Sequence, residues 1–288
     1  DGKTVDSYTV MIKFESDDNR IPIQSFDQAN DAATQAGEYT DQINEASDED
    51  ILLVKLPAGV AVKAADVKCV QVRAEKAQNK VTYTAVVRLE SEEQPLPIYG
   101  FPQPEKAAVF ADQVTDALLA AADEGADISL AKLIGGVAVR PRDVKMVNIR
   151  RDQSAQGARF TVIVKLEGNE LYVPVQTFTS EDEALTLSQE VSEKINEAEG
   201  EPVVVSLAGG VSVKPDEVKY IFVRRQRVNR GSTTAILYIV SAKVESEDEP
   251  IPLQILEDAE SAQMMAEVCV DLVCEALAEG DDDDDDDW

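Results

Sequence analysis

Apolar and polar residues alternate along four stretches of the chain that resemble one another. The stretches are "YTVMIKFESDDNRIPIQSF" from Tyr8, "YTAVVRLESEEQPLPIYGF" from Tyr83, "FTVIVKLEGNELYVPVQTF" from Phe160 and "YIVSAKVESEDEPIPLQIL" from Tyr238. They recur at intervals of about 75 residues and align without a gap. Each alternates, passes through a charged turn and continues into a second short apolar stretch, which predicts a β-hairpin.

Every second stretch carries a proline, namely Pro22, Pro97, Pro174 and Pro252. Proline has no N–H to donate to a β-ladder. We therefore expect these strands to lie at a sheet edge or to turn that N–H side outward.

A helical pattern follows each hairpin. Small and apolar residues recur at spacings of three and four, so they share one face of a helix that should pack on the sheet. The four sets are Ala32, Ala36, Tyr39, Ile43 and Ala46; Ala107, Ala111, Val114, Leu118 and Ala121; Ala184, Ser188, Val191, Ile195 and Ala198; and Ala262, Ala266, Cys269, Val273 and Ala276.

A second β-rich segment follows each of the first three helices. A strand leads into a tight turn at Gly59, Gly136 or Gly210, the next strand begins at the following valine, and a third strand comes after a short polar link. Glycine suits a turn whose φ is positive. A phosphate-binding loop would need a GK[ST] or GxGxxG pattern and a helix directly after it, and these segments have neither.

The fold class predicted is α+β, in tandem repeats that each hold a β-hairpin, one helix and a further antiparallel β meander. The copies span residues 1–77, 78–154 and 155–230, and 231–280 is a partial fourth copy with hairpin and helix only. Either the domain boundaries are permuted, with each helix serving the strands that follow it, or a partner chain completes the last copy. The copies could be separate beads or share sheets.

Charge and composition narrow the functional classes. Lys and Arg number 27 against 56 Asp and Glu, a net charge of −29, and such a chain repels nucleic acid and anionic membranes. A halophilic host is one possible cause of this charge, although lysine remains common. The absence of histidine excludes His-based acid–base catalysis, His-activated nucleophiles and His-ligated metals.

No candidate catalytic group replaces histidine. Cys69, Cys269 and Cys274 form no CxxC pair and are expected to be buried small hydrophobic residues in a reducing compartment. We expect no enzyme activity, no cofactor and no metal site. No apolar run reaches the length of a membrane span and no secretory signal is visible, so the expected location is the cytoplasm or a virion.

Positive charge gathers where the third strand of one copy leads to the next copy. The segment "RRQRVNR" contains four arginines and no acid, and Tyr220 and Phe222 precede it on the same strand. The candidate partner-binding residues there are Arg224, Arg225, Arg227, Arg230, Tyr220 and Phe222. The alternative is a solvated loop whose charges keep an exposed hairpin soluble.

The chain ends in seven aspartates and its only tryptophan. This tail, residues 281–288, is predicted to be either a disordered solubilising segment or a ligand for a basic cluster. Asp281, Asp287 and Trp288 are therefore further candidate binding residues. The ending resembles the acidic C-terminal tips of bacterial and phage single-stranded-DNA-binding proteins, and the resemblance covers the tail alone.

These observations favour a non-enzymatic structural or assembly protein that acts through protein–protein contacts. We expect self-association or docking on a multi-copy partner, because repeated weak contacts combine through effective concentration. A viral particle component, such as a decoration, tail or internal virion protein, fits this style of chain. The alternatives are a nucleic-acid-associated protein with basic hairpins, and an acidic DNA mimic.

Overall fold

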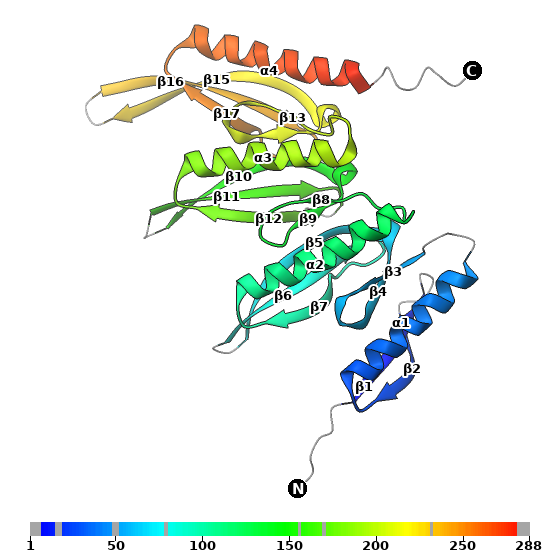
Figure 1. Ribbon diagram of the computed structural model, residues 1–288. Coiled ribbons are helices and arrows are strands. Elements are labelled where there is room, and N and C mark those ends of the chain that lie inside the picture. Colours follow the sequence, from blue (N-terminus) through cyan, green and yellow to red (C-terminus); the bar gives the residue numbers. More distant parts are fainter. Residues whose placement is uncertain are drawn as a thin grey trace, which may run out of the picture. The chain divides into compact units, whose positions relative to one another are not determined.

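The computed structural model describes residues 7–14, 19–47, 52–77, 80–154, 157–168, 171–230 and 233–280. Within these residues the chain is mixed α+β, with four helices and five antiparallel sheets (Figure 1). The predicted α+β class is therefore confirmed. The chain divides into two compact units, Asp1–Arg140 and Pro141–Trp288, which are described separately.

The first unit holds three sheets. Its elements in chain order are β1 (Tyr8–Lys13), β2 (Arg20–Phe26), α1 (Ala29–Ala46), β3 (Leu53–Leu56), β4 (Val60–Lys63), β5 (Val67–Ala77), β6 (Lys80–Leu89), β7 (Leu96–Phe101), α2 (Pro104–Asp123), β8 (Ala131–Lys132) and β9 (Ala138–Val139). β1 pairs with β2 and β3 pairs with β4, each as a two-stranded sheet. The other five strands form one sheet in the order β7-β6-β5-β9-β8.

The second unit holds two sheets. Its elements are β10 (Val144–Ser154), β11 (Gly157–Leu166), β12 (Leu171–Phe178), α3 (Glu181–Glu199), β13 (Val205–Ser206), β14 (Ser212–Val213), β15 (Val218–Arg230), β16 (Thr233–Val244), β17 (Ile251–Leu256) and α4 (Ala259–Gly280). The first sheet has the order β12-β11-β10-β14-β13. The second, which we name the C-terminal sheet, has the order β15-β16-β17.

The long strands connect neighbouring sequence copies. β5 pairs along its length with β6, β10 with β11, and β15 with β16, so the strand that ends one copy joins the hairpin that begins the next. Later in the chain, β9 pairs with the first residues of β5, and β14 pairs with the first residues of β10. The hydrogen-bonded sheets therefore cross the boundaries drawn from the sequence after residues 77, 154 and 230.

The proline-bearing strands lie at sheet edges, as predicted. β2, β7, β12 and β17 each occupy an edge of their sheet among the described strands. The pairing register shifts next to each proline, which faces Met11, Val86, Ile163 and Ser241 in turn. Because of the edge position and the local bulge, no hydrogen bond of the ladder depends on the N–H that proline lacks.

Helix α2 packs as its sequence pattern predicts. The five residues of its expected face, from Ala107 to Ala121, are all buried. The same core takes in Val54 and Leu56 from β3 and Val62 from β4, although these two strands form a separate sheet. The β3–β4 sheet and the five-stranded sheet of the first unit thus share one hydrophobic core.

The second unit repeats this arrangement. Leu207 and Val211, beside β13 and β14, belong to one core with Val240 of β16 and with Ala262 and Val273 of α4. The β13–β14 hairpin is therefore bonded to one sheet and packed against the next. Burial of these side chains is the main source of stability for such a joint.

The glycine turns adopt the predicted backbone. Gly59, Gly136 and Gly210 have φ values of +73°, +74° and +72°. The following strand begins at Val60 in the first turn, and at Ala138 and Ser212, one residue later than expected, in the other two. A Cβ atom on Gly136 would lie 2.8 Å from the backbone of Ala108 on α2, so the turn is close-packed as well as left-handed.

Candidate protein-binding surface on the C-terminal sheet

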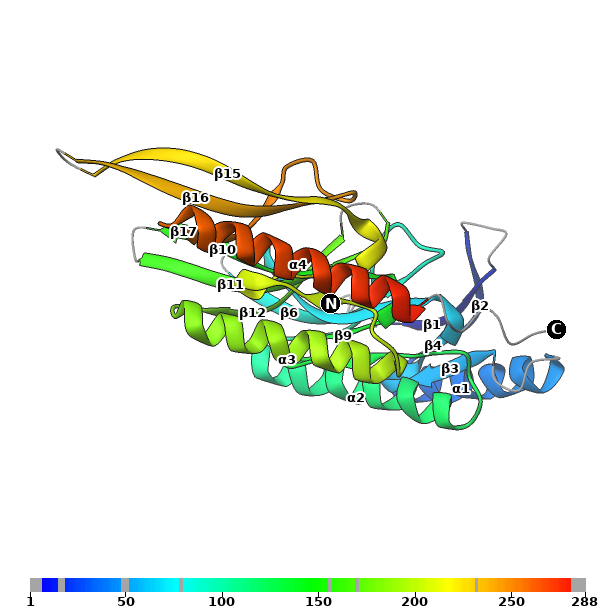
Figure 2. The same ribbon diagram turned by 90° about the horizontal axis from the view of Figure 1, so that it is seen from above.

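The predicted basic cluster lies near the end of the β15–β16 hairpin. Arg224, Arg225 and Arg227 are exposed and form no ion pair with another described residue. Seen from above, the hairpin extends beyond the first turn of α4 (Figure 2). The side chain of Arg230 lies outside the described part of the chain, and so do Asp281, Asp287 and Trp288. The structure therefore presents three of the candidate arginines on one projecting hairpin.

Side chains alternate across β15, so the arginines face two different ways. Arg225 shares the α4 side of the sheet with Val223, and Arg224 shares the other side with Tyr220 and Phe222. The rings of Tyr220 and Phe222 are 5.6 Å apart and tilted by 53°. The two aromatic residues thus form one small cluster, with a guanidinium group beside it along the strand.

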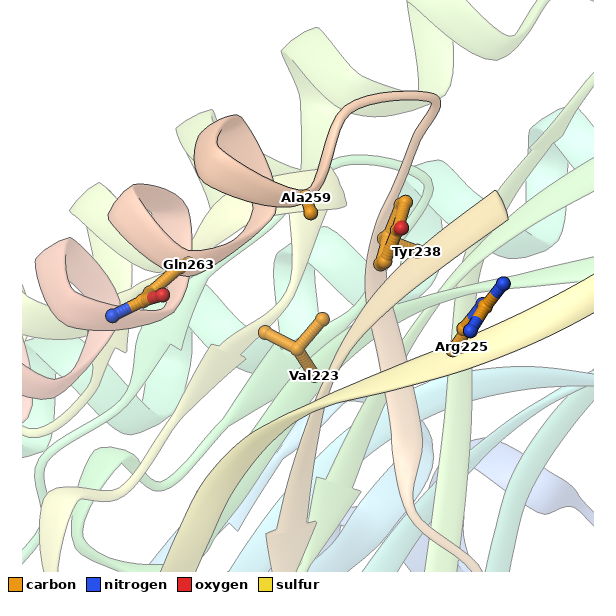
Figure 3. Close-up of a pocket in the computed structure, with 5 residues that line it drawn as sticks. All are labelled: Val223, Arg225, Tyr238, Ala259 and Gln263. Atoms are coloured by element: carbon orange, nitrogen blue, oxygen red, sulfur yellow. The ribbon is translucent and has the colours of Figure 1, made fainter. Parts of the chain in front are cut away.

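A shallow depression of about 360 Å³ lies where the hairpin meets the start of α4. Its lining is formed by Val223 and Arg225 of β15, Tyr238 of β16, and Ala259 and Gln263 of α4 (Figure 3). The guanidinium of Arg225 is the charged group in this lining.

Tyr220 is exposed, whereas the residues at the equivalent positions of β5 and β10 are buried. It pairs with Lys243 directly after a register shift, and Cys69 and Met146 follow the same shift on β5 and β10. The exposed fraction is 0% for Cys69, 2% for Met146 and 54% for Tyr220. β9 pairs with β5 and β14 pairs with β10 at these positions, whereas β15 pairs with no described strand but β16.

Helix α4 adds apolar residues that the sequence reasoning did not single out. Four large side chains outside its predicted core face are exposed, namely Met264, Val268, Val270 and Leu277. Cys274, expected to be buried, is exposed as well, because it lies on this outer side of the helix while Cys269 faces the core. The signal was present in the sequence, since the apolar residues of α4 cover more than one helical face.

Lys145 and Glu217 join the C-terminal sheet to the sheet of β10. The Lys145 ammonium donates a hydrogen bond to Glu217 Oε1 at 2.8 Å, and the backbone N–H of Ser246 donates to Oε2 at 3.0 Å. Burial alone would raise the pKa of Glu217, but these hydrogen bonds and the lysine charge lower it below its ordinary value. The hydrogen bond to Glu217 in turn raises the pKa of Lys145. The pair is therefore ionised at neutral pH.

No three His, Cys, Asp or Glu side chains among the described residues are placed to hold a metal ion. In the same residues, no helix combines the length and the apolar character needed to cross a membrane.

The fold and this surface define a class, an α+β protein of antiparallel sheets in which β15, at one edge of the C-terminal sheet, pairs with no described strand but β16. Comparisons with protein-family models, with curated proteins and with solved structures gave no match.

Proposed function

We propose that the chain is a non-enzymatic structural or assembly protein, built of tandem copies of about 75 residues with a truncated fourth copy. It acts through protein–protein contacts and either self-associates or docks on a multi-copy partner. As part of the same proposal, we place it among viral particle components. A repeated, acidic and histidine-free chain supports that setting.

The distribution of exposed apolar side chains carries the proposal. Between β2 and β15, the described residues include four exposed large hydrophobic side chains: Val81, Tyr99, Val109 and Tyr172. The segment from β1 to β2 has five: Tyr8, Met11, Phe14, Ile21 and Ile23. The C-terminal sheet and α4 have seven: Tyr220, Val223, Ile255, Met264, Val268, Val270 and Leu277.

Clustered apolar surface is characteristic of interaction sites, whereas single exposed apolar residues are ordinary. The first and last copies thus present the surfaces that a neighbouring molecule would cover. A net charge of −29 opposes association between like chains at low ionic strength, and salt screens that repulsion. We therefore expect association to strengthen as salt is added.

Sedimentation velocity over a concentration series tests the proposal. The wild-type chain should form concentration-dependent oligomers, more so at high salt, or should retain a partner in pull-down experiments. The variant Met264→Gln/Val268→Gln should weaken the contact on α4. Val109→Gln is the matched control, because Val109 is exposed to 59% and Val268 to 53%, both on helices. A monomer at every concentration and salt, with no partner retained, would exclude this function.

A nucleic-acid-associated protein is the second candidate, favoured by the exposed Arg224, Arg225 and Arg227 of β15, which form no ion pair with another described residue. A single-stranded oligonucleotide should then bind in a salt-sensitive manner. The triple variant Arg224→Ala/Arg225→Ala/Arg227→Ala should abolish binding. The matched control is Arg150→Ala/Arg151→Ala, on the corresponding strand β10, which should retain it. Equal loss in both variants would indicate a general charge effect and not a site on β15.

A further inference from the structure

We propose that the edge of β15, to which no described strand is bonded, accepts a β-hairpin from a second polypeptide, of the sequence type found in β3–β4. This inference deepens the proposed assembly function, on which it rests, by naming the chemistry of the partner. Addition of strands to an exposed sheet edge is a general mode of recognition, because the edge presents unpaired N–H and C=O groups.

The corresponding edges of β5 and β10 are each occupied by a strand of a later hairpin. In the first unit Cys69 and Val70 of β5 pair with Val139 and Ala138 of β9. In the second unit Met146 and Val147 of β10 pair with Val213 and Ser212 of β14. Tyr220 and Ile221 hold the same place on β15, and the incoming strand should face them through a valine and an alanine or serine.

A backbone hydrogen bond extends the pairing by one residue. The N–H of Arg140 donates to the Lys68 carbonyl at 2.8 Å, and the N–H of Lys214 donates to the Lys145 carbonyl at 2.9 Å. Lys68 and Lys145 are the residues that the register shift leaves without a partner on the neighbouring long strand. Lys219 lies at this position on β15. A basic residue directly after the incoming strand should therefore bond to the Lys219 carbonyl.

The carboxylate of Glu245 is placed to form an ion pair with that basic residue. In the first unit the guanidinium of Arg140 donates to the carboxylate of Glu90 at 2.8 Å. The backbone N–H of Glu90 bonds to Asp66, and that of Glu245 bonds in the same way to Glu217. The Glu245 side chain is largely exposed, with Lys219 3.7 Å away. An incoming lysine or arginine would therefore pair with Glu245 as Arg140 pairs with Glu90.

Helix α4 specifies which hairpin fits. Ala184, Val191 and Ile195 of α3 correspond to Ala262, Cys269 and Val273 of α4, and this match aligns Ser192 with Val270. The Ser192 hydroxyl bonds to Ser212 of β14 at 2.8 Å. Val270 cannot form this bond, so an incoming serine would lose a partner that an alanine does not need. The acceptor should prefer a hairpin with alanine at this position.

The segment "LLVKLPAGVAVKAAD", residues 52–66, has all of these features. Ala61 and Val62 precede the basic residue Lys63, as Ala138 and Val139 precede Arg140. Among the described strands, β4 pairs with β3 alone. We therefore commit to a hairpin of this type as the occupant, and the segment itself is the probe.

The experiment titrates the full chain into a labelled, cyclised peptide of residues 52–66 and follows fluorescence anisotropy. Cyclisation holds the hairpin, which alone would be marginally stable in water. We expect saturable one-to-one binding and slower amide exchange at Ile221. A peptide with Ala61→Ser should bind about tenfold more weakly, because a buried hydroxyl without a partner costs one or more kcal/mol.

A charge swap tests the register. Glu245→Lys should weaken binding of the unmodified peptide several-fold, and a Lys63→Glu peptide should recover it. Glu249→Lys is the matched control, because it makes the same charge change in the same loop and should leave binding unchanged. The proposal is overturned by absence of saturable binding, or by equal binding to the wild-type and Glu245→Lys chains with no recovery.

The two proposals can fail separately. Peptide binding to a chain that stays monomeric and retains no partner would leave the acceptor standing and remove the assembly function. Association of the chain that the peptide neither joins nor displaces would keep the assembly function and overturn the acceptor. Displacement of self-associated chains by the peptide would support the acceptor and identify a second copy as the donor.

Discussion

Lys165 on β11 places its ammonium group 2.6 Å from the carboxylate of Glu247, in the loop between β16 and β17. The Tyr172 hydroxyl donates to the same carboxylate at 2.7 Å, and the Lys165 side chain is only 5% exposed. In the first unit Lys13 on β1 pairs in the same way with Glu92, in the loop between β6 and β7. In each unit, a lysine of one sheet thus forms an ion pair with a glutamate in a hairpin loop of another sheet.

Replacing this lysine should loosen the C-terminal sheet. Lys165→Met leaves the Glu247 carboxylate partly buried without its cation, and we expect a loss of about 1–3 kcal/mol in the free energy of unfolding. Lys214→Met is the control, because the Lys214–Asp216 pair is largely exposed and should contribute less than about 1 kcal/mol. Urea unfolding of both variants measures the difference. Equal losses would show that burial of the pair does not matter.

Two glycines of the first unit should respond in opposite directions to alanine. Gly136 has φ +74° and its Cβ would meet the Ala108 backbone at 2.8 Å, so Gly136→Ala should cost about 2 kcal/mol or more. Gly37 lies within α1 with open space around it, and Gly37→Ala should stabilise by up to about 1 kcal/mol. Thermal unfolding should separate the two variants, and a neutral Gly136→Ala would contradict the close packing of the turn.

Asn196 should stabilise the segment that follows α3. Its side-chain oxygen accepts the N–H groups of Val203 and Val204, and its amide donates to the Val204 carbonyl, all at 3.0 Å. Asn196→Ala should cost about 2–3 kcal/mol and speed amide exchange at both valines, because three hydrogen bonds are lost. Asn196→Asp keeps the acceptor and should retain part of the protection. Unchanged exchange in the alanine variant would refute this role.

The Glu217–Lys145 pair predicts a pH dependence of stability. Because the folded-state pKa of Glu217 lies below the ordinary value of about 4.3, the pair stabilises the fold fully above that value. The stabilisation is lost as the pH falls through the lowered pKa. Glu217→Gln should therefore be less stable than wild type at pH 7, and the difference should shrink in acid. Glu249→Gln, an exposed change in charge, should show a small and constant difference.

Several features could be read from local sequence because each depends on one residue's own chemistry. Pro22 and Pro252 cannot donate to a ladder, and both lie on edge strands. Gly59 and Gly210 accept a positive φ without strain, and both form the expected turns. The helical spacing of Ala111, Val114 and Leu118 predicted the buried face of α2. Strand type, turn position and helix face are local properties, so periodicity and backbone preference suffice to predict them.

Strand partners are a different matter, because pairing depends on groups far apart in the chain. The sequence placed the third strand with the copy before it, whereas β5 is bonded to β6 after it and to β9 much later. Arg224, Arg225 and Arg227 of β15 were visible in the sequence, but the sequence could not show that they form no ion pair with another described residue. The exposure of Val268 and Val270 likewise depends on what α4 packs against, which no local pattern contains.

The sequence by itself thus determined the kinds of elements, their order and the absence of histidine chemistry, because these follow from residue type and spacing. Only the tertiary structure decided that Tyr220 is exposed where Cys69 and Met146 are buried. All three residues follow the same register shift on similar strands. Their environments differ because a distant hairpin pairs with β5 and with β10, whereas no described strand pairs with the corresponding edge of β15.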